Sequence, residues 1–408
     1  MSTKGFLLSL LFFLAPVAAW GGLLRVESTT AYAQYRDDDQ TMQMPFFEFF
    51  KGTYSSAKDD FQLDTNFCVT ENSNISQQGF QLYALDGAAW LLKDRTRLTF
   101  GRSFFTHMTV RPRVLDSVAV EHFLFDKEFR LGAYVGIERP PEDLSRQRST
   151  VSGVSLGYVS PNMSPLTAGL RFEHQAYEAI SRNRMKFSLN QPLQYSLSPE
   201  LMLDVERDLG YNFWSRAEVG ADIYPNLKST YGLRYQIYEL DPVTQIDEPI
   251  INIFSQGTVQ EASFKAGYFL SRDLYGSYFY AQDNFLIQAG HNGLGEKHQL
   301  ALSAVFDRTN VNLTAYRITS YGGWVVGGRG GISIKLNSKM ELSALSEYSR
   351  YQKITSSDRY AISNQIDLSY ILSNLLHIDV MGELDSNNAN TVDERFFLKL
   401  IYLAWKET

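Results

Sequence analysis

Three short patterns in the chain contain residue types that occur in catalytic or ligand-binding motifs. Gly153-Val154-Ser155-Leu156-Gly157 has the spacing of a nucleophile elbow, in which a sharp strand-to-helix turn exposes a reactive serine. Gly290, Gly293 and Gly295 are spaced like glycines that cradle a phosphate. Cys68 is the one cysteine, and a thiolate can be a nucleophile or a metal ligand. Whether any of these patterns does chemistry depends on the element that carries it.

The surrounding sequence gives none of them the element it needs. The serine pattern lies within an alternating strand, and the three glycines follow no strand-to-helix pattern. The six histidines are scattered without the paired spacing of a zinc site, and a single cysteine excludes an intramolecular disulfide. No Cys-x-x-Cys-His run is present for c-type haem. The sequence therefore predicts no enzyme, no metal site and no cofactor.

The dominant pattern is a repeated stretch of about ten residues that alternate apolar and polar side chains. In residues 359–372, Tyr360, Ile366 and Leu368 share one face, whereas Gln365 and Asp367 share the other. In a strand with lipid on one side and a polar lumen on the other, successive side chains must alternate between apolar and polar. This pattern predicts an all-β protein: a single antiparallel up-and-down transmembrane β-barrel.

Breaks rich in Asn, Asp, Gly, Pro and Ser divide the chain into about 22 strands, with an accepted range of about 18 to 22. Short turns, such as Pro225-Asn226, alternate with longer connections, such as residues 106–115, which we expect to be outer loops. No linker interrupts the pattern, so we expect one barrel domain over residues 20–408.

The N-terminal residues have the features of a cleaved export signal. Lys4 precedes the apolar residues 6–14, and Val17-Ala18-Ala19 supplies small residues for a signal peptidase. We therefore expect residues 1–19 to be a signal peptide. No later stretch reaches the roughly 18 apolar residues of a membrane helix, so we expect a location in the outer membrane of a Gram-negative cell.

Composition agrees with this class. The hydrophobic fraction is 44%, which is expected when alternate residues face lipid, and the aromatic fraction of 14% can supply interfacial girdles. The chain has a formal net charge of -7, so it does not have the excess of basic residues that is typical of a nucleic-acid-binding protein.

Polar faces of several predicted strands carry charged residues of both signs. If the apolar faces meet lipid, these residues line the lumen, where they form either a selectivity-tuning surface or a hydrated, ion-paired wall. The candidates are Arg171, Glu173, Arg216, Glu218, Lys228, Arg234, Asp367 and Glu383.

One predicted hairpin, residues 321–331, is unusually rich in glycine. Glycine within a strand marks a bend or a close approach of other atoms. We favour barrel curvature as the explanation, with an inward-folded loop or a partner protein as the alternative.

Short motifs near the start add a resemblance. They are Tyr35-Arg36-Asp37-Asp38-Asp39 at the end of the first strand, residues 61–69 before a polar loop, Leu98-Thr99-Phe100-Gly101-Arg102, and Leu115-Asp116-Ser117-Val118. In these motifs the chain resembles porin-like outer-membrane barrels of deltaproteobacteria and metal-reducing bacteria, including the barrels of porin–cytochrome conduits.

The resemblance implies two functions. One is passive diffusion of small hydrophilic solutes, and the other is a sheath around a periplasmic multihaem cytochrome. An outer-membrane exit for polysaccharide or lipid is a third possibility. Expected partners are outer-membrane lipid, lipopolysaccharide and the barrel-assembly machinery.

Overall fold

The computed structural model describes most of the chain after the first 21 residues. The described residues are 22–36, 42–58, 60–72, 77–92, 94–105, 108–139, 149–160, 166–177, 181–193, 197–210, 213–239, 257–287, 291–320, 323–353, 359–387 and 393–407. The predicted signal peptide lies outside them. Within these ranges, no helix is long and apolar enough to cross a membrane.

All described regular structure is β-strand. The strands are β1 (Gly22–Arg36), β2 (Met42–Gln43), β3 (Pro45–Ser56), β4 (Phe61–Asn72), β5 (Gln77–Leu91), β6 (Thr96–Phe105), β7 (Arg113–Leu124), β8 (Phe129–Glu138), β9 (Ser149–Val159), β10 (Thr167–Ala176), β11 (Ser181–Pro192), β12 (Glu200–Asp208), β13 (Phe213–Asn226), β14 (Ser229–Glu239), β15 (Gly257–Phe269), β16 (Leu274–Ile287), β17 (His291–Phe306), β18 (Thr309–Ser320), β19 (Gly323–Asn337), β20 (Met340–Lys353), β21 (Arg359–Ser373), β22 (Leu376–Asn387) and β23 (Asp393–Glu407).

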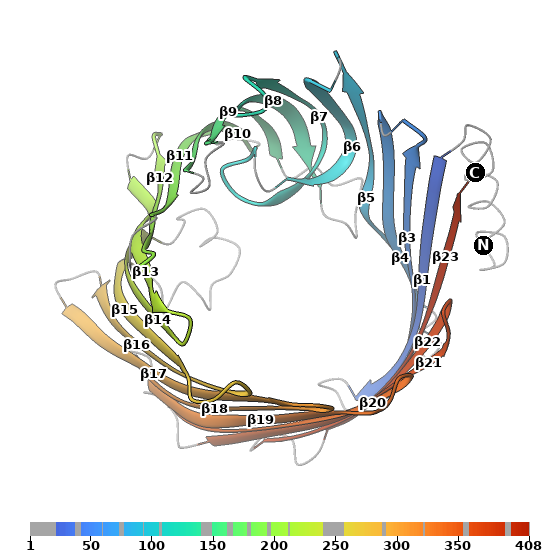
Figure 1. Cartoon of the computed structure of the whole chain (residues 1–408), viewed down its shortest axis with the longest axis vertical. Coiled ribbons are helices and arrows are strands. Elements are labelled where there is room, and N and C mark those ends of the chain that lie inside the picture. Colours follow the sequence, from blue (N-terminus) through green and yellow to red (C-terminus); the bar gives the residue numbers. More distant parts are fainter. Residues whose placement is uncertain are drawn as a thin grey trace.

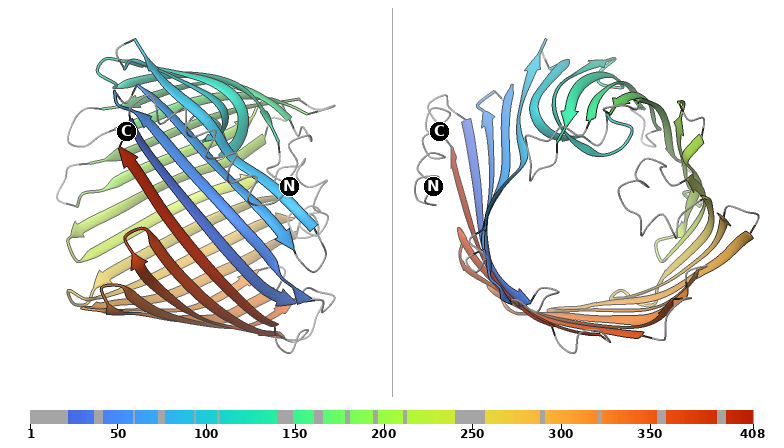
Figure 2. Two further views of the ribbon diagram at one scale, coloured as in Figure 1. Left: turned by 90° about the vertical axis from the view of Figure 1, so that its right-hand side faces the viewer. Right: turned by 180° about the vertical axis from the view of Figure 1, so that it is seen from behind.

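The strands form a closed antiparallel barrel. Apart from the two-residue β2, each strand pairs with its neighbours along the chain, and β1 pairs with both β3 and β23. The ring therefore contains 22 strands, as predicted (Figure 1). Closure leaves no open sheet edge, which satisfies backbone hydrogen bonds without water. The strands are inclined to the barrel axis, as closure of a sheet requires (Figure 2).

Alternation along the strands gives the barrel two different faces. On β7, Val118 and Val120 are exposed, whereas Ala119 and Glu121, which alternate with them, are buried. On β21, Ile366 is 61% exposed and points away from the face of Asp367. Large apolar side chains thus cover much of the outer surface, which is the surface a lipid bilayer would contact.

Candidate functional site

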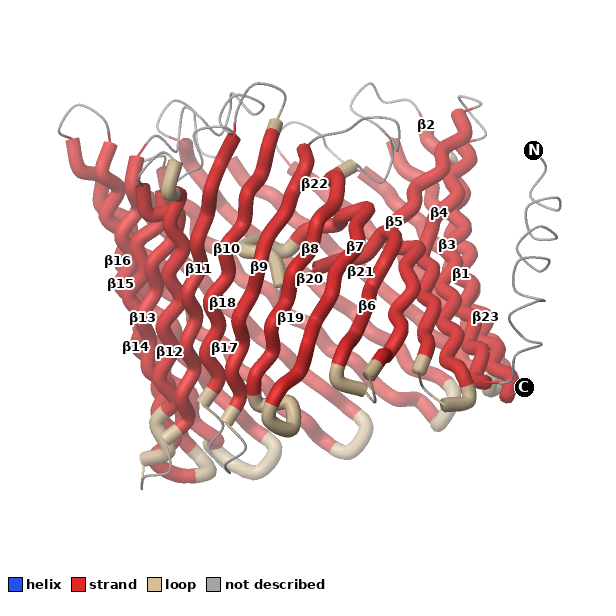
Figure 3. The backbone as a smooth tube through the Cα atoms, turned by 90° about the horizontal axis from the view of Figure 1, so that it is seen from above, coloured by secondary structure: helices blue, strands red, loops and turns tan. Residues whose placement is uncertain are grey.

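The connection between β6 and β7 departs from the expectation of an outer loop. Residues 108–112, which we call the lumen segment, follow β6 and precede β7. Figure 1 shows this connection inside the ring, next to the wall formed by β7 to β10, and Figure 3 shows it between the two ends of the barrel. Met108, Thr109 and Val110 are almost completely buried. The connection lies at the barrel end opposite the short turns, as expected of an outer loop, but its described residues 108–112 turn inward, and residues 113–115 belong to β7.

An apolar patch on the inner wall holds one side of the lumen segment. Met108 packs in a buried cluster with Phe105, Leu115, Tyr134 and Val151, among other residues. Burial of side chains of this size contributes roughly 1.5–3 kcal/mol each. The patch explains why an apolar segment turns inward instead of extending into solvent.

Gly132 on β8 leaves room for this packing. A Cβ atom at Gly132 would overlap Oγ of Ser155 on β9 and would lie 2.8 Å from the terminal methyl carbon of Met108, closer than such atoms approach. Because Gly132 has no side chain, the end of the Met108 side chain can pack directly against the backbone of β8, at a position that we call the Met108 seat.

A buried carboxylate holds the other side of the lumen segment. Glu173 on β10 is 0% exposed, and its Oε2 accepts hydrogen bonds from the Val110 backbone N–H at 3.2 Å and the Tyr134 hydroxyl at 2.8 Å. Its Oε1 accepts a hydrogen bond from Nη2 of Arg113 at 2.9 Å and lies 3.7 Å from Nη1 of Arg184. One side chain thus joins the lumen segment to β7, β8 and β11.

The surrounding polar groups extend this arrangement, which we call the Glu173 cluster: Arg113, Tyr134, Glu173, Gln175 and Arg184. Nη1 of Arg184 donates a hydrogen bond to Oε1 of Gln175 at 2.9 Å. Because the buried groups are charged and directly bonded, removal of one partner leaves another charge unpaired in a low-dielectric site. The cluster therefore fixes the position of the lumen segment.

A second link crosses from the lumen segment to β12. Nε of Arg111 donates a hydrogen bond to Oε1 of Glu206 at 2.7 Å. Glu206 lies opposite Arg216 of β13 and Lys186 of β11 in the strand register. The lumen segment is consequently attached to a wall of alternating charges.

The candidates from the sequence occupy different parts of the barrel. Arg171 and Glu218 line a groove of about 520 Å³ on β8 to β13, and Arg234 lines a second groove of about 600 Å³ on β13 to β17. Arg216 forms an ion pair with Glu218, while Arg234 lies 3.7 Å from Glu218 and 3.3 Å from Asp222.

Three candidates lie away from this group. Glu383 on β22 is 3.8 Å from Arg395 of β23, and Asp367 on β21 lies opposite Ser343 and Met381. Lys228 lies in the turn between β13 and β14, at the end of the barrel and not along a strand. The polar–apolar pattern of the sequence groups Lys228 with Arg234 on one strand face. The turn residues 227–228 instead follow directly after the predicted break Pro225-Asn226.

The glycine-rich hairpin has a local explanation that was not expected. A Cβ atom at Gly327 on β19 would collide with the Tyr316 ring from β18 and approach the Tyr348 backbone oxygen to 2.6 Å. Tyr316 donates a hydrogen bond to Glu347 at 3.1 Å. At Gly327, glycine therefore accommodates an aromatic side chain from the neighbouring strand.

The apparent nucleophile elbow lies wholly within β9. Ser155 pairs with Gly132 of β8 and Arg171 of β10, so it occupies an uninterrupted strand and not a strand-to-helix turn. Among the described residues, no group of three His, Cys, Asp or Glu side chains is arranged to hold a metal ion.

No protein-family model and no curated protein matches the chain. Its fold is similar to solved structures at low identity. Pseudomonas aeruginosa OccK2 (OpdF) in complex with glucuronate has a TM-score of 0.45 and 8% identity, over 94% of this chain and 97% of that chain. Pseudomonas aeruginosa OprD has a TM-score of 0.47 and 11% identity, over 94% of this chain and 95% of that chain. The P pilus usher (PapC) translocation pore has a TM-score of 0.49 and 9% identity, over 93% of this chain and 99% of that chain. At these values we transfer no function from them.

Proposed function

We propose that the chain is an outer-membrane channel for passive diffusion of small hydrophilic solutes, narrowed on one side by the lumen segment. The observation that carries the proposal is the attachment of residues 108–112 to the inner wall through Glu173 and Glu206. The exposed apolar outer face supports placement in a bilayer. A barrel of 16 to 18 strands already encloses an aqueous channel, so 22 strands leave room for a segment inside.

Solutes would pass a mixed-charge wall. We propose that Arg171, Arg216, Glu218, Arg234, Asp367 and Glu383 face the open lumen, with Lys228 at its rim, while Glu173 points inward beneath the lumen segment. The alternating ion pairs Arg216–Glu218 and Arg234–Asp222 support a surface that attracts polar solutes of either sign.

The lumen segment also favours a diffusion channel over a sheath for a multihaem cytochrome. A sheath needs an unobstructed cross-section for a threaded protein, whereas this segment occupies part of that cross-section beside β7 to β10 (Figure 1). The sheath therefore remains the less favoured function.

Single-channel conductance in a planar bilayer tests the proposal. The wild-type protein should conduct, and a variant with residues 108–112 replaced by a short Gly-Ser linker should conduct more because the obstruction is removed. The variant Ile366→Val, altered only on the outer face, should keep the wild-type conductance. A refolded wild-type barrel that does not conduct contradicts the channel.

A further inference from the structure

A row of side chains on the outer face of β16 to β21 interrupts the apolar surface. In the strand register, Tyr280 lies opposite His298, His298 opposite Arg317, Arg317 opposite Val326, Val326 opposite Arg350, and Arg350 opposite Tyr360. We call these six residues the outer arginine row. Residues directly opposite one another on paired strands share a face, and Val326 and Tyr360 are exposed. The two arginines therefore belong to the outer surface.

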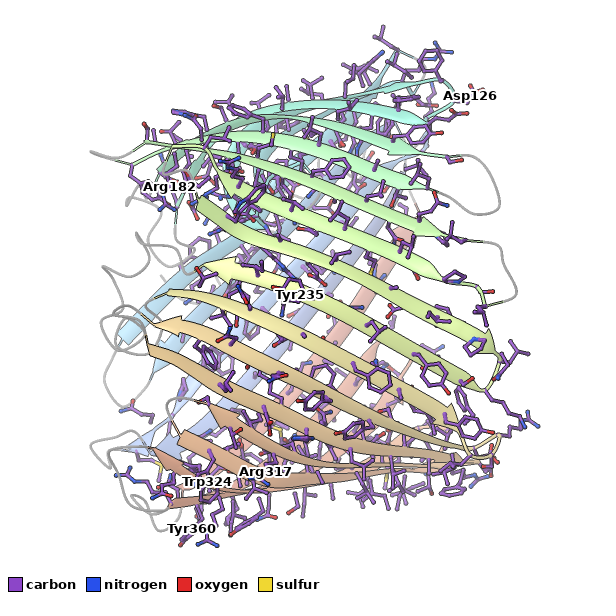
Figure 4. The ribbon with its side chains drawn as sticks, turned by 90° about the vertical axis from the view of Figure 1, so that its left-hand side faces the viewer. Asp126, Arg182, Tyr235, Arg317, Trp324 and Tyr360 are labelled. Atoms are coloured by element: carbon purple, nitrogen blue, oxygen red, sulfur yellow. The ribbon has the colours of Figure 1, made fainter. Side chains whose placement is uncertain are left out.

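The position of the row along the strands matches the edge of an apolar band. Leu300, Leu302 and Leu313 lie nearer the short-turn end on the same face and are exposed. Arg317 and Arg350 are each three residues from the end of their strand, at the opposite end from the short turns. Figure 4 shows Arg317, Trp324 and Tyr360 toward the end opposite Asp126.

Aromatic side chains lie at both ends of the row. The Arg350 guanidinium lies 6.0 Å from the Trp324 ring centroid, and Trp324 Nε1 donates a hydrogen bond to Gln352 at 3.0 Å. At the other end of the row, the His298 ring is 5.0 Å from that of Tyr280 and its Nε2 is 3.7 Å from Glu296. Tryptophan and tyrosine concentrate where a membrane protein crosses the headgroup layer.

The spacing suits a phosphorylated headgroup. Neighbouring strands are about 4.8 Å apart, so the Cα atoms of Arg317 and Arg350 are separated by about 10 Å across β19. Val326 between them is small and uncharged, so no acidic side chain stands between the two arginines in the register of β18, β19 and β20. A guanidinium binds phosphate through two parallel hydrogen bonds, whereas an outward arginine facing hydrocarbon would be costly.

We propose that the outer arginine row is a binding site for the phosphate of an anionic glycolipid in the surrounding membrane leaflet. Arg317 and Arg350 bind the phosphate, and Trp324 and Tyr360 pack beside the sugar and upper acyl region. The site rests on the proposed placement in an outer membrane but does not involve the lumen. It is a lipid site on the wall and not a solute site in the channel.

Lipid retention measured by native mass spectrometry tests the proposal. The full-length barrel is incubated in detergent with diphosphorylated lipid A, and the bound lipid is counted before and after replacement of both arginines (Arg317→Gln with Arg350→Gln). Loss of two charged bonds should reduce retention at least about tenfold. The matched control replaces an inner-face pair (Arg216→Gln with Arg234→Gln) and should retain lipid like the wild type. Heat-modifiable gel migration establishes that every variant is folded.

The outcomes separate this site from the channel. Equal retention by the wild type and the outer variant overturns the site, as does occupancy of the outer arginine row by a second copy of the chain. The outer variant should retain wild-type conductance in a bilayer of neutral lipid. Lipid binding without any conductance in the wild type would instead contradict the proposed channel and leave the lipid site standing.

Discussion

The carboxylate of Glu173 and the backbone N–H of Val110 are joined by a hydrogen bond of 3.2 Å, although the residues are 63 positions apart. The first residue belongs to a wall strand and the second to a segment inside the ring. Because Glu173 also bonds to Arg113 and Tyr134, the wall is organised around the segment that it holds. The position of residues 108–112 is consequently a property of the folded barrel.

Replacement of Glu173 by alanine should release the lumen segment. The change leaves the buried Arg113 with only its longer contact to Glu138, at 3.5 Å, and removes the carboxylate beside Arg184, at a cost of about 3–5 kcal/mol in the free energy of unfolding. We expect larger and noisier single-channel currents, measured in a planar bilayer, together with a lower melting temperature. Asp367→Asn, on the inner face of β21, is the control and should leave the open-channel noise unchanged. Wild-type currents from a folded Glu173→Ala barrel would show that Glu173 does not hold the segment.

Gly132→Val should displace Met108 from its seat. The new side chain would overlap both the Ser155 hydroxyl and the Met108 methyl group, and overpacking of this kind costs about 1–3 kcal/mol. Thermal unfolding followed by circular dichroism should show the loss of stability. Gly382→Val is the matched control, because a Cβ atom at Gly382 would meet nothing within 4 Å. Equal melting temperatures for the two variants would contradict the claim that packing at Gly132 requires glycine.

Arg234→Gln should shift the channel toward cation selectivity. The substitution removes the cation that lies beside Glu218 and Asp222, and thus leaves two carboxylates on this wall with one fewer counter-charge. The measurement is the reversal potential in a tenfold KCl gradient, roughly 58 mV at full selectivity, and we expect a shift of several millivolts. Arg317→Gln, which removes the same charge from the outer face, should not shift it. An anion-selective shift would contradict the placement of Arg234.

Cysteine labelling should distinguish the two faces of β21. In a Cys68→Ser background, a cysteine at position 366 should react with a lipid-soluble maleimide and one at position 367 with a water-soluble maleimide. Ile366 is exposed on the apolar face and Asp367 lies on the opposite face. The reverse labelling pattern would mean that the strand is shifted by one residue, since such a slip exchanges the two faces.

The barrel could be predicted from the sequence because its evidence is local and repeated. Alternation on β21 identifies both faces of that strand without knowledge of any other strand. The short turn Ser271-Arg272-Asp273 lies where turn-forming residues predict it, and the turn at Asp307-Arg308 falls within the predicted break 307–310, whose last two residues belong to β18. The boundary near Lys228 was less accurate, because the register between β13 and β14 shifts after Ile223.

The site was harder to predict because its parts are distant in sequence. Arg171, Glu173 and Arg216 could be assigned to polar faces, but Arg113, Tyr134 and Arg184 could be recognised as partners of Glu173 only after the strands were placed side by side. One local signal was present. Leu115 and Val151 are apolar on strand faces that should be polar, which indicates that something covers them.

The sequence by itself determined an all-β chain with two chemically different strand faces, because side-chain alternation has a period of two and needs no partner to be recognised. Only the tertiary structure decided that residues 108–112 turn into the ring, since the patch and the carboxylate that hold them come from β6 to β10. It also aligned His298, Arg317 and Arg350 across the outer face, because strand register is a relation between distant segments and not a property of any one of them.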